Sequence, residues 1–206
     1  TADVGFAYED VMMNEELSPA GAPSWFRTGG MVKGDPMTLE IVDDFTFVIK
    51  SEGPYGGFSV NLGVLGWRSY QELLKPRHYL EQFHKDYADP DELAALIAEN
   101  NFETWQQLFA FKDVALGNIM RPQALEIPKL TPWIVKESTD ERCYLERNPY
   151  YFAVDPAGNQ LPYIDAIDFR TVRDIEVLTV EQIAGNVDYG VETVSMTKLA
   201  LYRENE

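Results

Sequence analysis

Residues 145–165 read LERNPYYFAVDPAGNQLPYID and lie between two segments whose apolar residues predict strands. The preceding strand covers residues 144–147, and the following one, residues 164–172, alternates apolar and polar side chains. Between them, residues 155–159 (DPAGN) have turn chemistry, with Pro at the second position and Gly available for left-handed backbone. Residues 133–136 predict one more strand, before a polar turn. We therefore expect short strands around a loop rich in Tyr and Pro.

The segment after this loop predicts alternating helices and strands. Asp174 begins a helix that ends at Gly185, residues 187–191 form a short strand, and Ser195 caps a last helix. Strand, helix, strand and helix in this order predict α/β crossover units. The apolar residues expected to be buried by the first of these helices are Val177, Leu178 and Ile183.

The N-terminal half predicts a β-hairpin set among helices. Apolar and polar residues alternate on both sides of the acidic pair Asp43 and Asp44, which predicts a hairpin over residues 37–49. Asp89 followed by Pro90 is typical of a helix start. The other predicted elements are a helix capped by Thr1, a glycine-rich loop with one short strand over 51–66, a helix over 73–84 and a helix from about 103.

A long loop over residues 18–36 carries two aromatic residues, Trp25 and Phe26. Such side chains either pin a loop to the core or are held out for a partner. Pinning to the core is the interpretation that we favour.

Composition describes a folded, strongly acidic protein. The 206 residues are 45% hydrophobic and 13% aromatic, which is typical of a chain with a packed core. The formal net charge of -17 repels phosphate backbones and anionic lipids, so nucleic-acid binding and polybasic membrane attachment are disfavoured. No apolar run approaches the roughly 18 residues that a membrane span needs.

Catalytic and metal-binding motifs are not evident. His78 and His84 are six residues apart on one predicted helix, which does not suit a zinc site, and we expect both on the surface. Cys143 lies in a predicted strand, where a buried, inert thiol is the ordinary case. No phosphate loop or nucleophile elbow is present, so we expect no metal and no cofactor. Paired carboxylates are too common in this chain to exclude a carboxylate-dependent hydrolase.

Several segments in the same order resemble one family, the extracellular solute-binding proteins of ABC transporters, in their peptide, oligopeptide and nickel class (family 5). The residues that carry the resemblance are 1–11 (TADVGFAYEDV), 40–47 (EIVDDFTF), 76–80 (PRHYL), 145–165 and 183–188 (IAGNVD). The segment from Thr131 departs from the family pattern by lacking a preceding glycine, and Asn186 replaces a common acidic residue.

The resemblance implies a mixed α/β (α+β) fold that forms part of lobe I of a two-lobe, periplasmic-binding-protein-like structure. Residues 1–145 would form a small outer subdomain, and residues 146–206 the start of the main lobe with βαβ-like units. Family members are much longer, so the resemblance also implies an internal fragment in which a ligand meets only part of its shell.

The resemblance further implies a non-enzymatic protein that captures a small ligand for an ABC transporter permease, in the periplasm or outside the cell. A lipid-anchored parent protein is left open. A peptide is the first expected ligand and an oligosaccharide the second; a carboxylate-dependent hydrolase and a sensory domain are rival functions. The residues expected to face the ligand are Tyr189, Val191, Glu192 and Thr193, together with Trp25 and Tyr55, for which packing against the core is an equal alternative.

Overall fold

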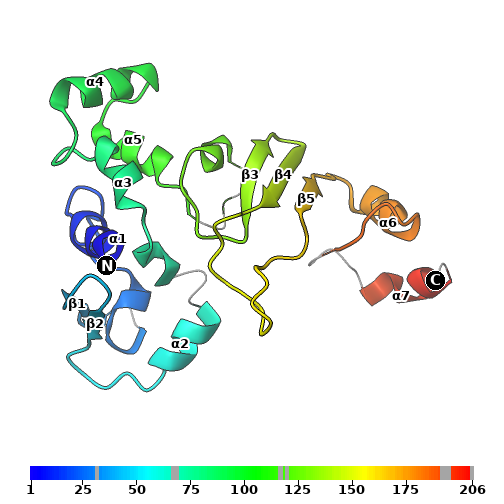
Figure 1. Cartoon of the computed structure of the whole chain (residues 1–206), viewed down its shortest axis with the longest axis horizontal. Helices are drawn as coiled ribbons and strands as arrows, with labels where there is room; N and C mark the ends of the chain where they lie inside the picture. Colours follow the sequence, from blue (N-terminus) through cyan, green and yellow to red (C-terminus); the bar gives the residue numbers. More distant parts are fainter. Residues whose placement is uncertain (31–32, 66–69, 116–117, 119–120, 191–195, 205–206) are drawn as a thin grey trace.

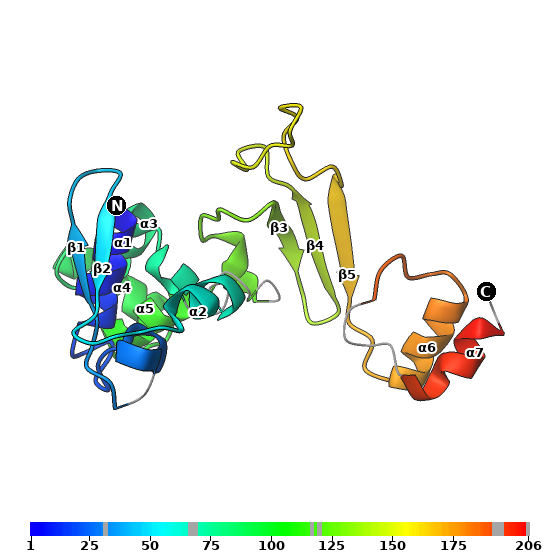
Figure 2. The ribbon, with the colours of Figure 1, turned by 90° about the horizontal axis from the view of Figure 1, so that it is seen from below.

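The computed structural model covers the whole chain and describes all residues except 31–32, 66–69, 116–117, 119–120, 191–195 and 205–206. Three parts follow one another along the molecule: an N-terminal body of helices and a hairpin, a three-stranded sheet, and a C-terminal pair of helices (Figure 1). The same order is seen after a rotation by 90° (Figure 2). The N-terminus and the C-terminus therefore lie at opposite ends of an elongated molecule.

The N-terminal body begins with one continuous helical segment. It consists of α1 (Ala2–Phe6) and a π-helical continuation, η1 (Ala7–Met12). The predicted hairpin is confirmed, because β1 (Thr38–Ile41) pairs antiparallel with β2 (Phe47–Lys50). The remaining helices of this body are α2 (Phe58–Leu65), α3 (Arg77–Leu80), α4 (Pro90–Glu99) and α5 (Trp105–Lys112), and its 3-10 turns are η2 (Ser24–Phe26), η3 (Thr28–Gly30), η4 (Tyr70–Leu73) and η5 (Glu81–Phe83).

The strands predicted around residues 145–165 form the second sheet. A 3-10 turn, η6 (Pro122–Leu125), precedes β3 (Trp133–Ser138), β4 (Arg142–Arg147) and β5 (Ala166–Arg170). The sheet order is β3-β4-β5 and both pairings are antiparallel. Residues 148–165 leave the sheet between β4 and β5 as a projecting loop (Figure 2).

The C-terminal part holds α6 (Ile175–Ile183), the 3-10 turn η7 (Met196–Lys198) and α7 (Leu199–Arg203). Asp174 caps α6, as predicted, by accepting hydrogen bonds from the backbone N–H groups of Glu176 and Val177. Side chains link the two helices: Lys198 Nζ donates to Thr179 Oγ1 at 3.1 Å, and the Tyr202 hydroxyl donates to Gln182 Oε1 at 3.0 Å.

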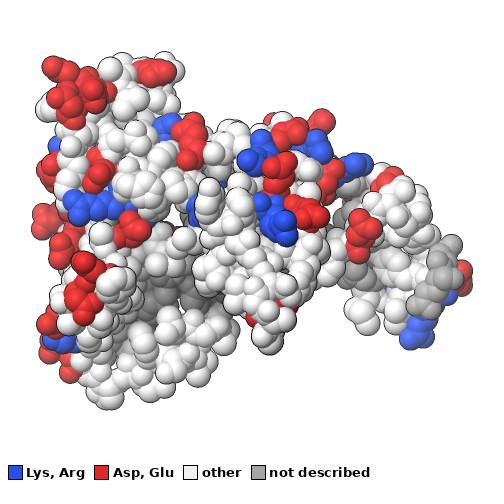
Figure 3. All heavy atoms as spheres, in the orientation of Figure 1, with Lys and Arg blue, Asp and Glu red and all other residues white. Residues whose placement is uncertain are grey.

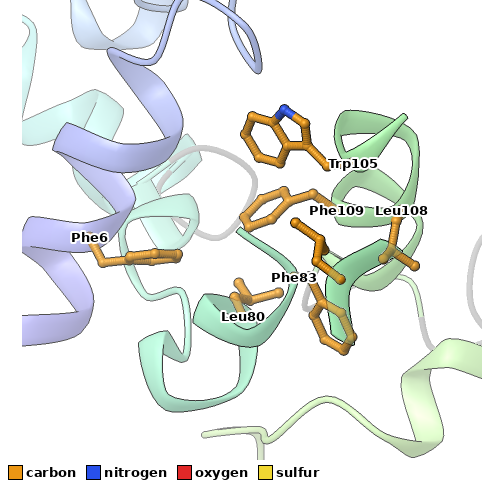
Figure 4. Close-up of a cluster of buried hydrophobic side chains, with 7 residues drawn as sticks. Phe6, Leu80, Phe83, Trp105, Leu108 and Phe109 are labelled. Atoms are coloured by element: carbon orange, nitrogen blue, oxygen red, sulfur yellow. The ribbon is translucent and has the colours of Figure 1, made fainter. Parts of the chain in front are cut away.

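Among the described residues, buried apolar side chains form three separate clusters. The first packs the loop over 18–36 against η1 and the hairpin, and the second joins α1 to α3, α4 and α5. In the second cluster, Phe6 points from α1 toward Leu80 and Phe109 (Figure 4). The third lies between η6 and the β3-β4-β5 sheet and contains Cys143. The fold is thus the mixed α+β class that was expected, built from local clusters.

Two predicted N-terminal features are wrong. Thr1 does not cap α1, because its hydroxyl instead donates to the Asp43 carbonyl in the hairpin turn at 2.9 Å. The predicted strand within residues 51–66 is the helix α2. Its alternating apolar residues meet no neighbouring strand in the described structure, so Val60 and Leu62 stay exposed and the backbone hydrogen bonds close locally.

The helix predicted over residues 73–84 is interrupted. Pro76 has no backbone N–H and adopts an extended conformation, so η4 ends before it and only the short α3 and η5 follow. His84, expected on the surface, is fully buried. Its ring packs against those of Phe6, Trp105 and Phe109, which come from segments distant in the sequence.

The C-terminal crossover units also differ from the prediction. All described strands pair antiparallel, and residues 187–190 form no strand and pair with none of the described strands. On α6, Val177 is exposed, while the buried side chain is Thr179. The boundary expected between residues 145 and 146 falls inside β4, whose residues pair on both sides of it.

Candidate ligand-binding site

Trp25 and its neighbour Phe26 fix the loop over residues 18–36 to the N-terminal body. Phe26 is fully buried in the first core cluster, beside Met37 and Val4. Trp25 is half-buried, packs against the same cluster, and meets the Phe26 ring edge-on at 5.6 Å between ring centroids. The prediction that these aromatics pin the loop is confirmed for both residues.

Tyr55 is held between the loop and α2. Asn61 Nδ2, on α2, donates a hydrogen bond of 2.6 Å to the Tyr55 hydroxyl oxygen, and the Phe58 ring lies 5.7 Å from the Tyr55 ring. The hydroxyl also lies over Gly30, where a Cβ atom would be only 2.5 Å away. Gly30 has a φ of +65°, a conformation that glycine adopts without strain. The position of Tyr55 is therefore tightly defined.

Trp25 and Tyr55 lie against one hydrophobic cluster, together with half-buried Tyr8 and Phe58. A polar contact, Thr28 Oγ1 to Ser51 Oγ at 3.0 Å, lies in the same part of the body. The sequence-based prediction missed Phe58 and Asn61, because their helix was interpreted as a loop with a short strand. The spacing of Tyr55, Phe58 and Asn61 by three residues was the available signal.

The remaining candidates lie elsewhere. Tyr189 is 83% exposed, and Val191, Glu192 and Thr193 fall outside the described residues. Tyr189 follows α6, and in both views α6 and α7 lie on the side of β5 away from α2 (Figures 1 and 2). The structure therefore places Trp25 and Tyr55 together but does not bring Tyr189 to them.

Cys143, the metal-binding residue types and the paired carboxylates are the groups that the sequence offered for chemistry. Cys143 is fully buried, and burial raises the pKa of its thiol, as the prediction of an inert cysteine requires. Within the described residues, no cluster of His, Cys, Asp and Glu is arranged to hold a metal ion. Asp140 and Glu141, one of the paired-carboxylate candidates, are exposed in the turn between β3 and β4.

Comparison with solved structures gives a long match to an oligopeptide-binding protein, OppA. The match covers 99% of this chain and 30% of that protein, with 30% sequence identity and a TM-score of 0.80. This chain is built like part of a solute-binding protein. The resemblance and the mixed fold expected from the sequence are thereby confirmed.

Two more solute-binding relatives agree with this result. The periplasmic alpha-galactoside-binding protein of Rhizobium meliloti (strain 1021) is 26% identical over 193 residues, which are 90% of this chain. The periplasmic binding protein MelB of Agrobacterium fabrum C58, solved with stachyose, covers the whole chain with a TM-score of 0.64 and 22% identity, and it supports the fold alone. No family model matches the chain.

The chain spans only a minor part of these solute-binding relatives: 22% of the alpha-galactoside-binding protein and 30% of OppA. Among the residues that the structure describes, no helix is long and apolar enough to cross a membrane.

Proposed function

We propose that this chain forms part of an extracytoplasmic solute-binding protein that captures an oligopeptide for import by an ABC transporter permease. The observation that carries the proposal is the match to the oligopeptide-binding protein over 99% of the chain at a TM-score of 0.80. The sequence match to a periplasmic alpha-galactoside-binding protein supports a location in the periplasm or outside the cell.

An oligosaccharide is the second candidate ligand. It is favoured by the sequence match to an alpha-galactoside-binding protein over 90% of the chain. Half-buried aromatic side chains such as Trp25 and Tyr55 have the flat apolar faces on which sugar rings stack, and they serve equally for apolar peptide side chains. The two ligand classes therefore have to be separated by measurement.

The proposed ligand contacts come from two regions. Trp25 and Tyr55 would contribute the parts of their rings that the cluster leaves uncovered. Tyr189, with Val191, Glu192 and Thr193, would contribute from the segment after α6, where Glu192 would pair with a peptide amino group or a sugar hydroxyl. An extended ligand would contact both regions.

We also propose a division into an outer subdomain and the start of a main lobe. The expected boundary after residue 145 cuts the β3-β4-β5 sheet, which packs as one unit with η6 through the third core cluster. The links from α5 to η6 and from β5 to α6 are the places where a division would break no strand pairing.

Binding without chemical conversion separates this proposal from its rivals. The test uses the protein expressed from its whole gene, in thermal-shift and calorimetric titrations with tripeptides to pentapeptides and with stachyose. We expect a ligand-dependent rise in melting temperature and an unchanged ligand on recovery. Conversion of any bound ligand would favour the hydrolase instead. Failure of every peptide and sugar to bind would contradict the proposal, and binding of stachyose alone would select the second candidate.

A further inference from the structure

A concave surface lies between α4 and the beginning of α5, at the opposite end of the N-terminal body from α2 (Figure 1). This α4 groove has a volume of about 460 Å³. One wall is the face of α4 that carries Leu93, Ala94 and Ile97, and Trp105 closes the groove from α5. A volume in this range suits a small ligand or a few side chains of a peptide. Neither Trp25 nor Tyr55 belongs to it.

The polar end of the α4 groove is built around the carboxylate of Glu16. One carboxylate oxygen of Glu16 accepts hydrogen bonds from Trp105 Nε1 at 3.0 Å and from Gln106 Nε2 at 2.9 Å. The other oxygen pairs with the ammonium group of Lys85, whose Nζ also lies over the Trp105 ring, 5.7 Å from its centroid. The hydrogen bond from Lys85 is the largest cause of the lowered pKa of Glu16. Glu16 and Lys85 therefore neutralise each other, and Glu16 links Trp105 and Gln106 in the groove wall.

One acceptor in the wall is unused. With Gln106 Nε2 committed to Glu16, Gln106 Oε1 has no hydrogen-bond partner among the described residues and is shielded from water. An unpaired shielded acceptor is unfavourable by about 1–3 kcal/mol, and an N–H group that reaches it as the groove is filled would supply the missing hydrogen bond. The unused acceptor thus favours an occupant that brings hydrogen-bond donors.

The surroundings of the α4 groove are acidic. Asp91, Glu92, Glu99 and Glu103 lie on α4 or on the turn that follows it, and none forms an ion pair within the described part of the chain. Acidic side chains gather at both ends of α4 (Figure 3). Because Lys85 is already paired with Glu16, the net potential here is negative and attracts cations.

We propose that the α4 groove binds a positively charged segment of a partner protein. An apolar side chain of the segment would lie against Leu93, Ala94 and Ile97, and an adjacent lysine or arginine would face Glu103 and donate toward Gln106. The apolar wall of the groove would bury the apolar side chain of the segment. The unpaired carboxylates would orient the basic side chain and repel acidic segments.

Three acetylated and amidated peptides test this proposal by isothermal calorimetry and by amide chemical shifts of α4. Their repeating units are Lys-Leu, Lys-Ser and Glu-Leu. We expect the Lys-Leu peptide to bind, the other two to bind at least about tenfold more weakly, and added salt to weaken binding.

Two matched variants locate the site. Ala94→Trp fills the groove from an exposed position of α4, whereas Ala95→Trp adds the same bulk on the opposite side of the helix. We expect about tenfold weaker binding for Ala94→Trp and no change for Ala95→Trp or for Tyr55→Phe. Absence of binding, equal binding of the Glu-Leu peptide, or an unaffected Ala94→Trp variant would overturn the proposal. Tyr55 belongs to the proposed ligand site and not to the α4 groove. Unchanged peptide binding in Tyr55→Phe would therefore show that the two sites bind independently.

Discussion

Lys75 Nζ lies 2.6 Å from a carboxylate oxygen of Asp113, and this pair ties the turn after η4 to the end of α5. Glu72 adds a second carboxylate oxygen at 3.0 Å. Lys75 is only 9% exposed, and burial by itself would lower the pKa of its ammonium group. The carboxylates of Asp113 and Glu72 outweigh burial, so the pKa is raised above its ordinary value. The two segments are thus joined by a charged contact between hydrophobic clusters.

Replacing Lys75 by Met tests this contact. Lys75→Met leaves Asp113, whose side chain is 16% exposed, without its cation, so we expect a loss of roughly 3 kcal/mol in the free energy of unfolding. Lys50→Met removes an exposed pair with Glu40 and should cost less than about 1 kcal/mol. Urea denaturation measures both. Because the folded-state pKa of Lys75 is raised, its contribution is complete below pH 10.5 and declines as pH rises through the folded-state value. Equal effects of the two variants would contradict this account.

Gly30 and Gly56 form a matched pair for the position of Tyr55. Gly30→Ala places a Cβ 2.5 Å from the Tyr55 hydroxyl and strains a backbone with φ of +65°. We expect a loss of roughly 1–2 kcal/mol and an altered Tyr55 environment. At Gly56, a Cβ atom would meet no other atom within 4 Å and φ is not positive, so Gly56→Ala should be neutral or stabilise by about 0.5 kcal/mol. Thermal unfolding measures the change in stability, and the NMR chemical shifts of the Tyr55 ring measure the change in its environment. Unchanged stability in Gly30→Ala would contradict the tightly defined position of Tyr55.

The N-cap of α4 is the third test. Asp89 accepts hydrogen bonds from the backbone N–H groups of Asp91 at 3.0 Å and Glu92 at 3.1 Å. Asp89→Ala leaves these donors without the cap and should cost about 1 kcal/mol, whereas Asp89→Ser keeps an acceptor and should retain most of the stability. Amide hydrogen exchange in the first turn of α4 checks the local effect. An equal loss of stability in Asp89→Ala and Asp89→Ser would show that the negative charge of Asp89, and not its capping hydrogen bonds, stabilises α4.

Asp155 gives a pH-dependent test in the projecting loop. Hydrogen bonds from the Tyr163 hydroxyl first, and then from Asn159, lower the pKa of the Asp155 carboxyl from its ordinary value of 3.8 to about 2. A lowered folded-state pKa stabilises the loop above pH 3.8, and this contribution is lost as pH falls toward 2. In the Tyr163→Phe variant we expect the pKa of Asp155 to rise toward 3.8. NMR titrations that monitor the chemical shift of the Asp155 carboxyl carbon measure this change. Tyr150→Phe, on an exposed ring of the same loop, is the control and should leave the titration unchanged.

Local signals in the sequence predicted the elements whose hydrogen bonds close within a few residues. The cap at Asp89, the alternation across Asp43 and Asp44, and the cap at Asp174 all occur as expected. The strand expected around Phe58 failed because alternation predicts a strand only where another strand can pair with it. The burial of His84 could not be predicted, since its aromatic neighbours come from α1 and α5.

The sequence by itself determined the acidic character, the buried cysteine, the hairpin, the capped helices and the resemblance to solute-binding proteins, because each depends on residue types at short spacing. Only the tertiary structure decided that Trp25 and Tyr55 pack against one cluster, that Tyr189 is exposed, and that a groove forms between α4 and α5. These relationships depend on which segments, distant in the sequence, pack against each other. The close packing of the whole chain determines these contacts, and no local sequence pattern encodes them.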